Sequence, residues 1–150
     1  MVDNFSLAGL LANSKYKAPQ EGKYYRIQNL NYKTYINEGI TSNGLGCEGL
    51  NEDKLAQYWT LVKIGSGFAL QNVCTQRYVV RQGGALSRQY TTQEAKPGQG
   101  FTCKRTADDT NFTYYIVDNG GVGLHCDQGS NVVGWHTEGL STSTWGFEEV

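Results

Sequence analysis

The chain has 150 residues, of which 39% are hydrophobic and 12% aromatic, and its 13 basic and 14 acidic side chains give a formal net charge of −1. This length and composition indicate one globular domain with a buried core. The near-zero charge disfavours a nucleic-acid partner, because affinity for phosphate depends largely on clustered lysine and arginine. The 19 glycines indicate many tight turns and argue against long helices.

Targeting and metal-binding patterns are not evident in the sequence. No apolar stretch approaches the roughly twenty residues that cross a bilayer, and the apolar run from Phe5 to Ala12 lacks the preceding positive segment of a signal peptide. The cysteines are widely spaced, with neither a CxxC pair nor a histidine at metal-ligand distance. We therefore expect a cytoplasmic protein with free thiols, no metal, no cofactor and no membrane insertion.

Residues 1–22 form the N-terminal part of the chain and lie outside the repeats described next. They are either a loose arm or a segment that covers one end of the core with Phe5, Leu7, Leu10 and Leu11, and the sequence supports both readings equally. Beyond them, Tyr24–Gln28, Tyr35–Asn37 and Tyr58–Val62 are typical of short strands in hairpins. Glycine-containing breaks predict hairpin turns at 38–46, 82–84 and 120–123.

The sequence repeats itself. Residues 27–36 align with residues 70–79 at a shift of about 43 positions, with glutamine, asparagine and tyrosine identical. A third copy sets Tyr114 over Tyr24 and the run His125-Cys126-Asp127 over Tyr35-Ile36-Asn37. Each copy closes on an aromatic residue that is followed two positions later by an apolar one; these aromatics are Trp59, Phe101 and Trp145.

Strand alternation predicts which of these residues are buried. Ile36, Val79 and Cys126 share one face, which we expect to point to the core. The opposite face then carries their neighbours Asn37, Val80 and Asp127. The three closing aromatics are expected in the core as well.

Three repeats of four short strands each, at about 23–66, 67–112 and 113–150, can bury their hydrophobic faces only together, which predicts an all-β barrel with a hairpin cap. The closing motif Gln57-x-Trp59, with its degenerate versions Gln99-x-Phe101 and Ser143-x-Trp145, resembles that of ricin B-chain-like β-trefoil lectins. The resemblance covers residues 23–150 and is nearest to the single-domain, cytoplasmic forms of mushrooms. It implies a fungal, non-catalytic lectin with a role in defence.

The resemblance also implies a sugar site in the third repeat. The lectins join an acidic residue after the second strand to an aromatic residue on the third, which here are Asp127 and Trp135, and Asn131 and His136 add hydrogen-bonding groups. A carboxylate accepts hydrogen bonds from sugar hydroxyls, and an indole packs against sugar C–H groups. Thr142 stands where the lectins often carry asparagine, and Ser143 replaces their usual glutamine.

Other readings of these residues stay open. Trp135 also fits a strand aromatic tucked under a loop, Asp127 an Asx-turn carboxylate and His136 an exposed strand residue. The first and second repeats carry Asn37 and Val80 in place of the acid, so both sites are expected to be silent or altered, and avidity for glycans or glycoproteins would then require a homodimer.

The alternative function is inhibition of a serine or cysteine protease, which β-trefoils of this size also perform. A rigid exposed loop would then occupy the protease cleft. The candidate loops are 40–49, with Asn43-Gly44, and 85–92, with Arg88. An enzyme is disfavoured, since no local set of residues supplies a nucleophile, a base and an orienting group.

Overall fold

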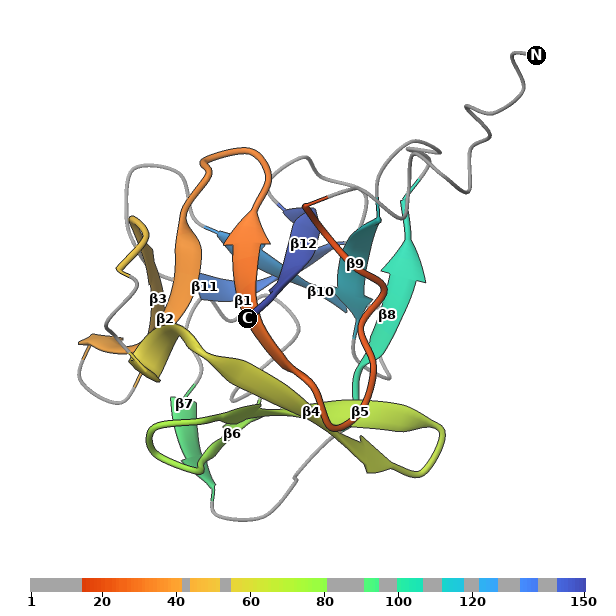
Figure 1. Cartoon of the computed structure of the whole chain (residues 1–150), viewed down its shortest axis with the longest axis horizontal. Coiled ribbons are helices and arrows are strands. Elements are labelled where there is room, and N and C mark those ends of the chain that lie inside the picture. The colour runs from red at the N-terminus through yellow and green to blue at the C-terminus, as the bar shows by residue number, and fades with distance from the viewer. Residues whose placement is uncertain are drawn as a thin grey trace.

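The structure of this chain is a computed structural model. It describes residues 15–41, 44–51, 55–80, 91–94, 100–106, 112–117, 122–126, 133–137 and 143–150. Within these ranges, twelve strands form one continuous sheet, and helical structure is limited to a short 3-10 turn at 55–57 and the single 3-10 residue Ser143, which confirms the predicted all-β class (Figure 1).

The strands follow one another in three sets of four. The first set is β1 (Tyr24–Asn29), β2 (Tyr35–Thr41), β3 (Gly44–Glu48) and β4 (Trp59–Ile64), with the 3-10 turn η2 (Leu55–Gln57) before β4. The second is β5 (Gly67–Asn72), β6 (Tyr78–Val80), β7 (Thr91–Glu94) and β8 (Thr102–Arg105). The third is β9 (Thr113–Val117), β10 (Val122–Cys126), β11 (Val133–Thr137) and β12 (Trp145–Glu149).

The outer strands of each set close into a barrel. Strand β1 pairs with β12 and β4, β4 with β5, and β9 with β12 and β8, all antiparallel. The ring closes between β5 and β8, where Phe68 and Phe101 exchange backbone hydrogen bonds of 2.8 and 2.6 Å. We call this two-bond junction the β5–β8 seam.

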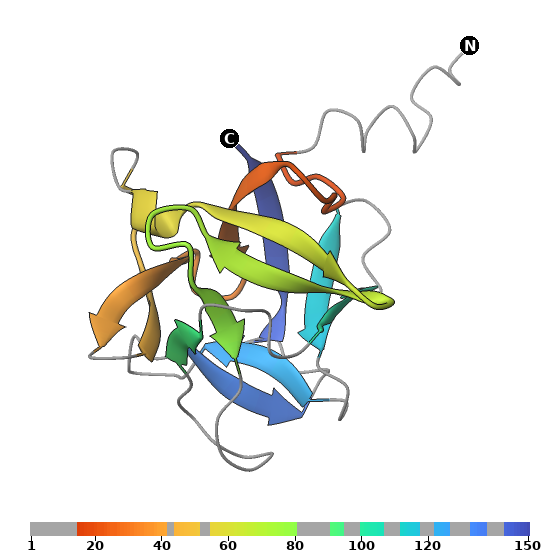
Figure 2. The same ribbon diagram turned by 90° about the horizontal axis from the view of Figure 1, so that it is seen from below.

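The inner strands of each set form hairpins at one end of the barrel. These hairpins are β2–β3, β6–β7 and β10–β11, and each is joined to a barrel strand by one residue pair (Figure 2). The three joining pairs are Gln28–Tyr35, Gln71–Tyr78 and Val117–Gly123. The expected barrel with a hairpin cap is therefore present.

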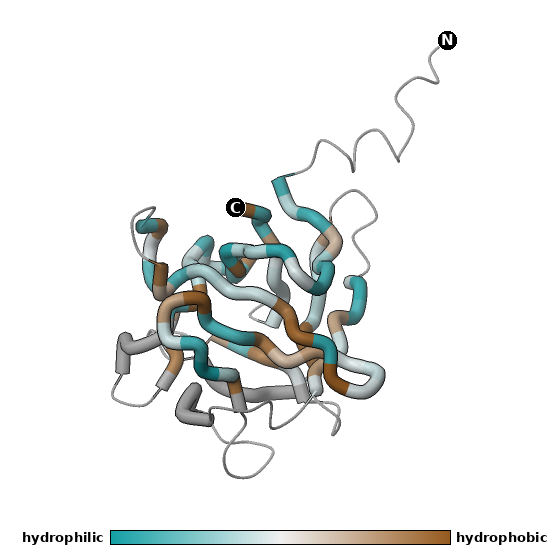
Figure 3. Tube along the Cα trace, turned by 60° about the horizontal axis from the view of Figure 1, so that its bottom comes forward, coloured by the Kyte–Doolittle hydropathy of each residue, from teal (hydrophilic) through white to brown (hydrophobic). Residues whose placement is uncertain are grey.

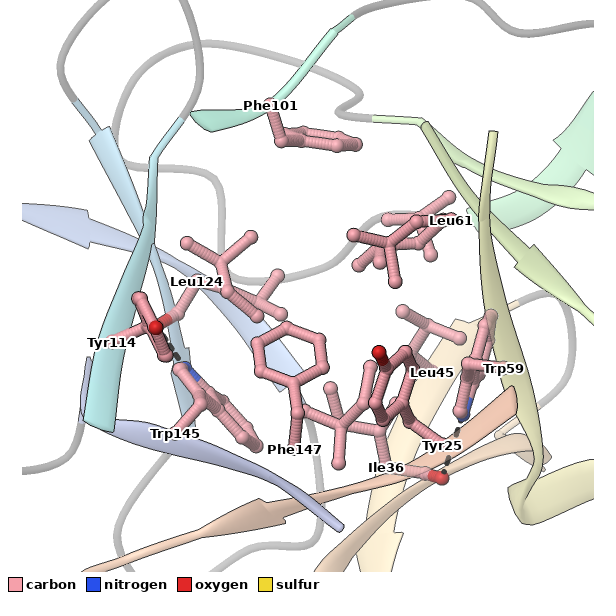
Figure 4. Packing of buried hydrophobic residues seen from close by; sticks show 14 of the residues in the cluster. Tyr25, Ile36, Leu45, Trp59, Leu61, Phe101, Tyr114, Leu124, Trp145 and Phe147 are labelled. Atoms are coloured by element: carbon pink, nitrogen blue, oxygen red, sulfur yellow. Dashed lines mark hydrogen bonds between the residues drawn. The ribbon is translucent and has the colours of Figure 1, made fainter. Parts of the chain in front are cut away.

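The core lies inside the barrel and under the cap. Hydrophobic residues alternate with polar ones along the barrel strands (Figure 3), and the inward set is buried. The predicted closing aromatics Trp59, Phe101 and Trp145 are each at most 1% exposed (Figure 4). The indole nitrogens of the two tryptophans donate to backbone carbonyls of the cap, Trp59 to Ile36 at 3.1 Å and Trp145 to Leu124 at 2.9 Å.

Alternation within the cap was only partly predicted correctly. Ile36, Val79 and Cys126 are buried as expected. Asn37 was expected on the opposite, outward face, yet it is only 1% exposed. The reason is that η2 packs against β2, so this strand is covered on both of its faces.

The alignment of the third repeat with the first also needs correction. The barrel pairs Tyr25 with Trp59 and Tyr114 with Trp145, so Tyr114 corresponds to Tyr25 rather than to Tyr24. In the cap the two indole hydrogen bonds make Leu124, not Cys126, the counterpart of Ile36. A constant shift cannot be correct at both places, because the connection before β10 is one residue shorter than the connection before β2.

The repeated Gln-Asn pair shapes the turns that follow β1 and β5. The Asn29 carboxamide oxygen accepts the next turn's amides at 3.0 and 3.1 Å, and that of Asn72 does the same at 2.9 and 3.1 Å. Each turn then passes through a residue of positive φ, Lys33 at 60° and Gln76 at 64°. The identical side chains in the two copies therefore make the same turn twice.

Residues 15–23 run over the outside of the barrel, and we call this segment the strap (red in Figure 1). The Lys17 amide donates to the Phe147 carbonyl at 2.8 Å, and the Gln20 amide donates to the Tyr25 hydroxyl at 2.9 Å. The Tyr16 ring covers Gly146 so closely that a Cβ there would meet ring carbons. These contacts join the strap to β1 and β12.

Candidate functional site

The predicted sugar site belongs to the β10–β11 hairpin. Cys126 pairs with Val133, so the segment that carries Asp127 and Asn131 connects two hydrogen-bonded strand ends. Asp127, Asn131 and Thr142 themselves lie outside the described residues. The structure describes Trp135 and His136 through their backbone positions in β11.

The register of the hairpin fixes the strand positions of the two aromatic residues. Trp135 is the partner of Leu124, and His136 is the partner of Gly123. Since its strand partner Leu124 is fully buried, any binding test of Trp135 requires a measurement of folding beside it.

The loops of the inhibitor alternative are described in part. Gly44 is the first residue of β3 and pairs with Thr41, next to the tip of the β2–β3 hairpin. Asn43 and Arg88 lie outside the described residues. Both candidate loops therefore remain predictions.

In the first repeat, a buried glutamine organises the loop after β3, in the part of the repeat that carries Thr142 in the third. The Gln57 amide nitrogen donates to the Gly49 carbonyl at 2.8 Å and to the Glu48 carboxylate at 3.2 Å. Its oxygen accepts the Asn51 amide at 3.0 Å. The sequence singled out Gln57 only as part of a closing motif, but a polar residue two positions before a core aromatic was the signal for this structural role.

The third repeat lacks this connection. Ser143 takes the place of Gln57 and is fully buried, yet its hydroxyl has no hydrogen-bond partner within the described part of the chain. A hydroxymethyl group is too short to reach a loop in the way that a glutamine amide does. Within the described residues, Ser143 therefore makes no contact of the kind that Gln57 makes.

A charged cluster lies on the outer wall of the barrel, where the strap meets β1, β2 and β12. The Glu148 carboxylate accepts the Tyr35 hydroxyl at 3.0 Å and forms ion pairs with Lys15 at 3.3 Å and Arg26 at 3.7 Å. Burial, and then the hydrogen bond to Glu148, raise the pKa of Tyr35. This cluster fastens the strap and contains no pair of free acid and base groups.

The described residues hold no group of three or more His, Cys, Asp or Glu side chains that could bind a metal ion. No helix among them is long and apolar enough to cross a membrane.

Known proteins were compared with the chain by sequence and by structure. No family model and no curated protein matches its sequence. A solved structure of a Macrolepiota procera ricin B-like lectin in complex with lactose matches with a TM-score of 0.75 at 16% identity, over 89% of this chain and 100% of that one.

Two other solved structures match over nearly their whole length. The Rhizoctonia solani agglutinin has a TM-score of 0.73 at 14% identity, with 89% of this chain and 99% of that one covered. The designed threefold-symmetric protein ThreeFoil has a TM-score of 0.71 at 13% identity, with 85% and 99% covered. The chain is a β-trefoil.

The β-trefoil fold explains the geometry above. Its barrel and cap repeat three times, as the three joining pairs do here, and the indole hydrogen bond recurs in the first and third repeats. Identities of 13–16% establish the fold alone, so the chemistry of this β-trefoil has to be argued from its own residues.

Proposed function

We propose that this β-trefoil is a non-catalytic, carbohydrate-binding protein of the ricin B-like lectin type, with its glycan site in the third repeat. The observation that carries the proposal is the Cys126–Val133 pairing. It joins the segment with Asp127 and Asn131 to the strand that bears Trp135 and His136. The structural neighbours that are a lectin with lactose and an agglutinin add support from their own activities.

The chemistry of these residue types suits a sugar. The Asp127 carboxylate would accept hydrogen bonds from two adjacent hydroxyls and so orient the ring. The Trp135 indole would bury the C–H face of the same ring, and the Asn131 amide and His136 imidazole would bind further hydroxyls. The hydroxyl of Thr142 would take the place of an amide, which predicts modest affinity.

A glycan array on the wild-type protein is the first test, because it identifies the sugar. Asp127→Asn and Trp135→Ala are then each expected to lower retention on that glycan at least tenfold. Tyr24→Ala is the matched control, since Tyr24 is a 50% exposed aromatic residue on β1 of the barrel, and it should bind as the wild type does.

The thermal midpoint and far-UV spectrum of each variant show whether a loss of binding comes from the site itself or from a loss of the fold. If Asp127→Asn keeps the fold and the full affinity, the proposed site is wrong. If the wild-type protein binds no glycan but inhibits trypsin or papain, and Arg88→Ala or Asn43→Ala abolishes that inhibition, the protease-inhibitor alternative replaces the proposal.

A further inference from the structure

Two buried thiols from different repeats meet inside the hairpin cap. Cys47 lies on β3 and Cys126 ends β10, and they are 1% and 3% exposed. Their side chains are hydrogen-bonded to each other. The two thiols belong to the same hydrophobic cluster, so solvent does not separate them.

The packing of the cap holds this pair in place. Cys47 is paired with Ile36 across the first hairpin, and Cys126 is paired with Val133 across the third. The two hairpins are themselves in contact through β3 and β11. Two side chains about eighty residues apart in sequence are thus held together by two independently hydrogen-bonded strand pairs.

We propose that Cys47 and Cys126 are a redox pair that a small hydroperoxide converts into an intramolecular disulfide joining the first and third repeats. One thiolate attacks the peroxide oxygen, forms a sulfenic acid and releases hydroxide from hydrogen peroxide. The second thiol then displaces water from the sulfenic sulfur as the S–S bond forms. The two thiols lose two electrons and two protons, and the peroxide becomes two molecules of water.

The surroundings make this reaction slow but the product stable. The hydrogen bond to Cys126, and then burial, raise the pKa of Cys47 well above its ordinary value, so the reactive thiolate is scarce near neutral pH. A hydroperoxide is small enough to enter when the cap opens locally. Once formed, the disulfide restricts the unfolded chain over a long loop and stabilises the folded state.

Peptide mapping tests the proposal directly, because trypsin leaves the four cysteines in four different peptides. These are 34–54 with Cys47, 64–77 with Cys74, 89–104 with Cys103 and 106–150 with Cys126. The exposed Cys74 is first replaced in a Cys74→Ser protein to prevent intermolecular disulfides. After hydrogen peroxide, alkylation in denaturant and digestion, we expect 34–54 linked to 106–150.

Cys103 is the matched control within the same molecule. Cys103 is half-buried and desolvation raises its pKa to about 12, but no second thiol is among the causes of that shift. Peptide 89–104 should therefore be recovered alkylated. The linked peptide should be absent from Cys47→Ala, and the oxidised Cys74→Ser protein should melt on the order of 5–10 °C higher than the reduced one.

The proposal is wrong if both thiols are recovered alkylated after prolonged peroxide treatment, or if they carry sulfinic acid without a linked peptide. A linkage of either one to Cys103 would overturn it equally. Should Cys47→Ala fail to fold, the peptide map of the Cys74→Ser protein still decides between these outcomes.

Discussion

Gln57 and Ser143 occupy the same position in two repeats but differ in how much they stabilise the fold. Gln57 makes three hydrogen bonds that hold the loop after β3. Its replacement by alanine leaves buried polar partners unsatisfied, so we expect Gln57→Ala to lower the free energy of unfolding by about 2–3 kcal/mol. Ser143→Ala removes a buried hydroxyl without a partner in the described chain and should change it by less than about 0.5 kcal/mol.

Urea denaturation of the two variants measures this difference. Equal losses of stability would show that Ser143 is as well bonded as Gln57 and would contradict the contrast drawn between the two repeats.

The two residues of positive φ provide a second comparison. A non-glycine residue in the left-handed region costs about 1 kcal/mol relative to glycine. Lys33→Gly should therefore raise the free energy of unfolding by about 0.5–1 kcal/mol. Gln76→Gly should raise the free energy of unfolding by less. The side-chain amide nitrogen of Gln76 donates to the Val73 carbonyl at 2.9 Å, and that bond would be lost.

Denaturation of both glycine variants tests this ranking. A larger gain for Gln76→Gly than for Lys33→Gly would mean that the side-chain hydrogen bond has no stabilising value in this turn.

At the scale of elements, the β5–β8 seam joins two barrel strands through a single residue pair, Phe68–Phe101, fewer than any other junction of the barrel strands. A Cβ on Gly67 would lie 2.7 Å from the Phe101 carbonyl oxygen, the acceptor of one of the seam's two hydrogen bonds. Backbone cannot move aside as a side-chain tip can, so Gly67→Ala should cost about 2–3 kcal/mol. Gly49→Ala, with no heavy atom within 4 Å of the new Cβ, is the control and should be nearly neutral.

Thermal unfolding of the two alanine variants checks this prediction. Similar melting temperatures would mean that the seam adapts to an extra methyl group, and that barrel closure does not depend on the close approach of Gly67.

The elements also show what the sequence could and could not predict. The barrel could be predicted because the closing aromatic recurs in all three copies and the Gln-Asn turn in the first two. The register of the third repeat was not predicted, because one residue fewer before β10 breaks a constant shift. The strap was left open since its contacts, such as Lys15 with Glu148, have no periodic pattern.

The candidate site was predictable only as a set of residue types. Asp127 and Trp135 could be named from the resemblance, but the pairing of Trp135 with Leu124 is set by the register of the β10–β11 hairpin, which residue types alone do not give. The Cys47–Cys126 contact was not foreseen either, since it joins two repeats and neither spacing nor alternation along one strand indicates it.

For the whole molecule, the buried phenols and thiols predict stability at neutral pH and a loss of stability in alkali. Burial is the leading cause that raises the pKa of Tyr16, Tyr25, Tyr35 and Tyr114 above 10, and that of Cys103 from 9.0 to about 12. A group whose folded pKa is raised contributes stability below its unfolded pKa and loses it above. Stability should therefore fall progressively from about pH 9 to pH 12.

Urea midpoints measured from pH 7 to pH 11 test this dependence. We expect Cys103→Ala to reduce the part of the decline that begins near pH 9, to which Cys47 also contributes, and to leave the phenol part above pH 10. A midpoint that stays constant to pH 11 would contradict the burial of these groups.

The pairing of the first and last strands determines how the barrel responds to force. Strand β1 meets β12 over five residue pairs, from Tyr25–Glu149 to Asn29–Trp145, and the Val150 amide donates to the Tyr24 carbonyl at 3.0 Å. Tension between Tyr24 and Val150 acts on one end of the paired strands, so their hydrogen bonds break one after another from that end. Force applied between Asn29 and Val150, at opposite ends of the paired strands, would instead load all of their hydrogen bonds in shear at once. The barrel should resist that direction of pulling far more strongly.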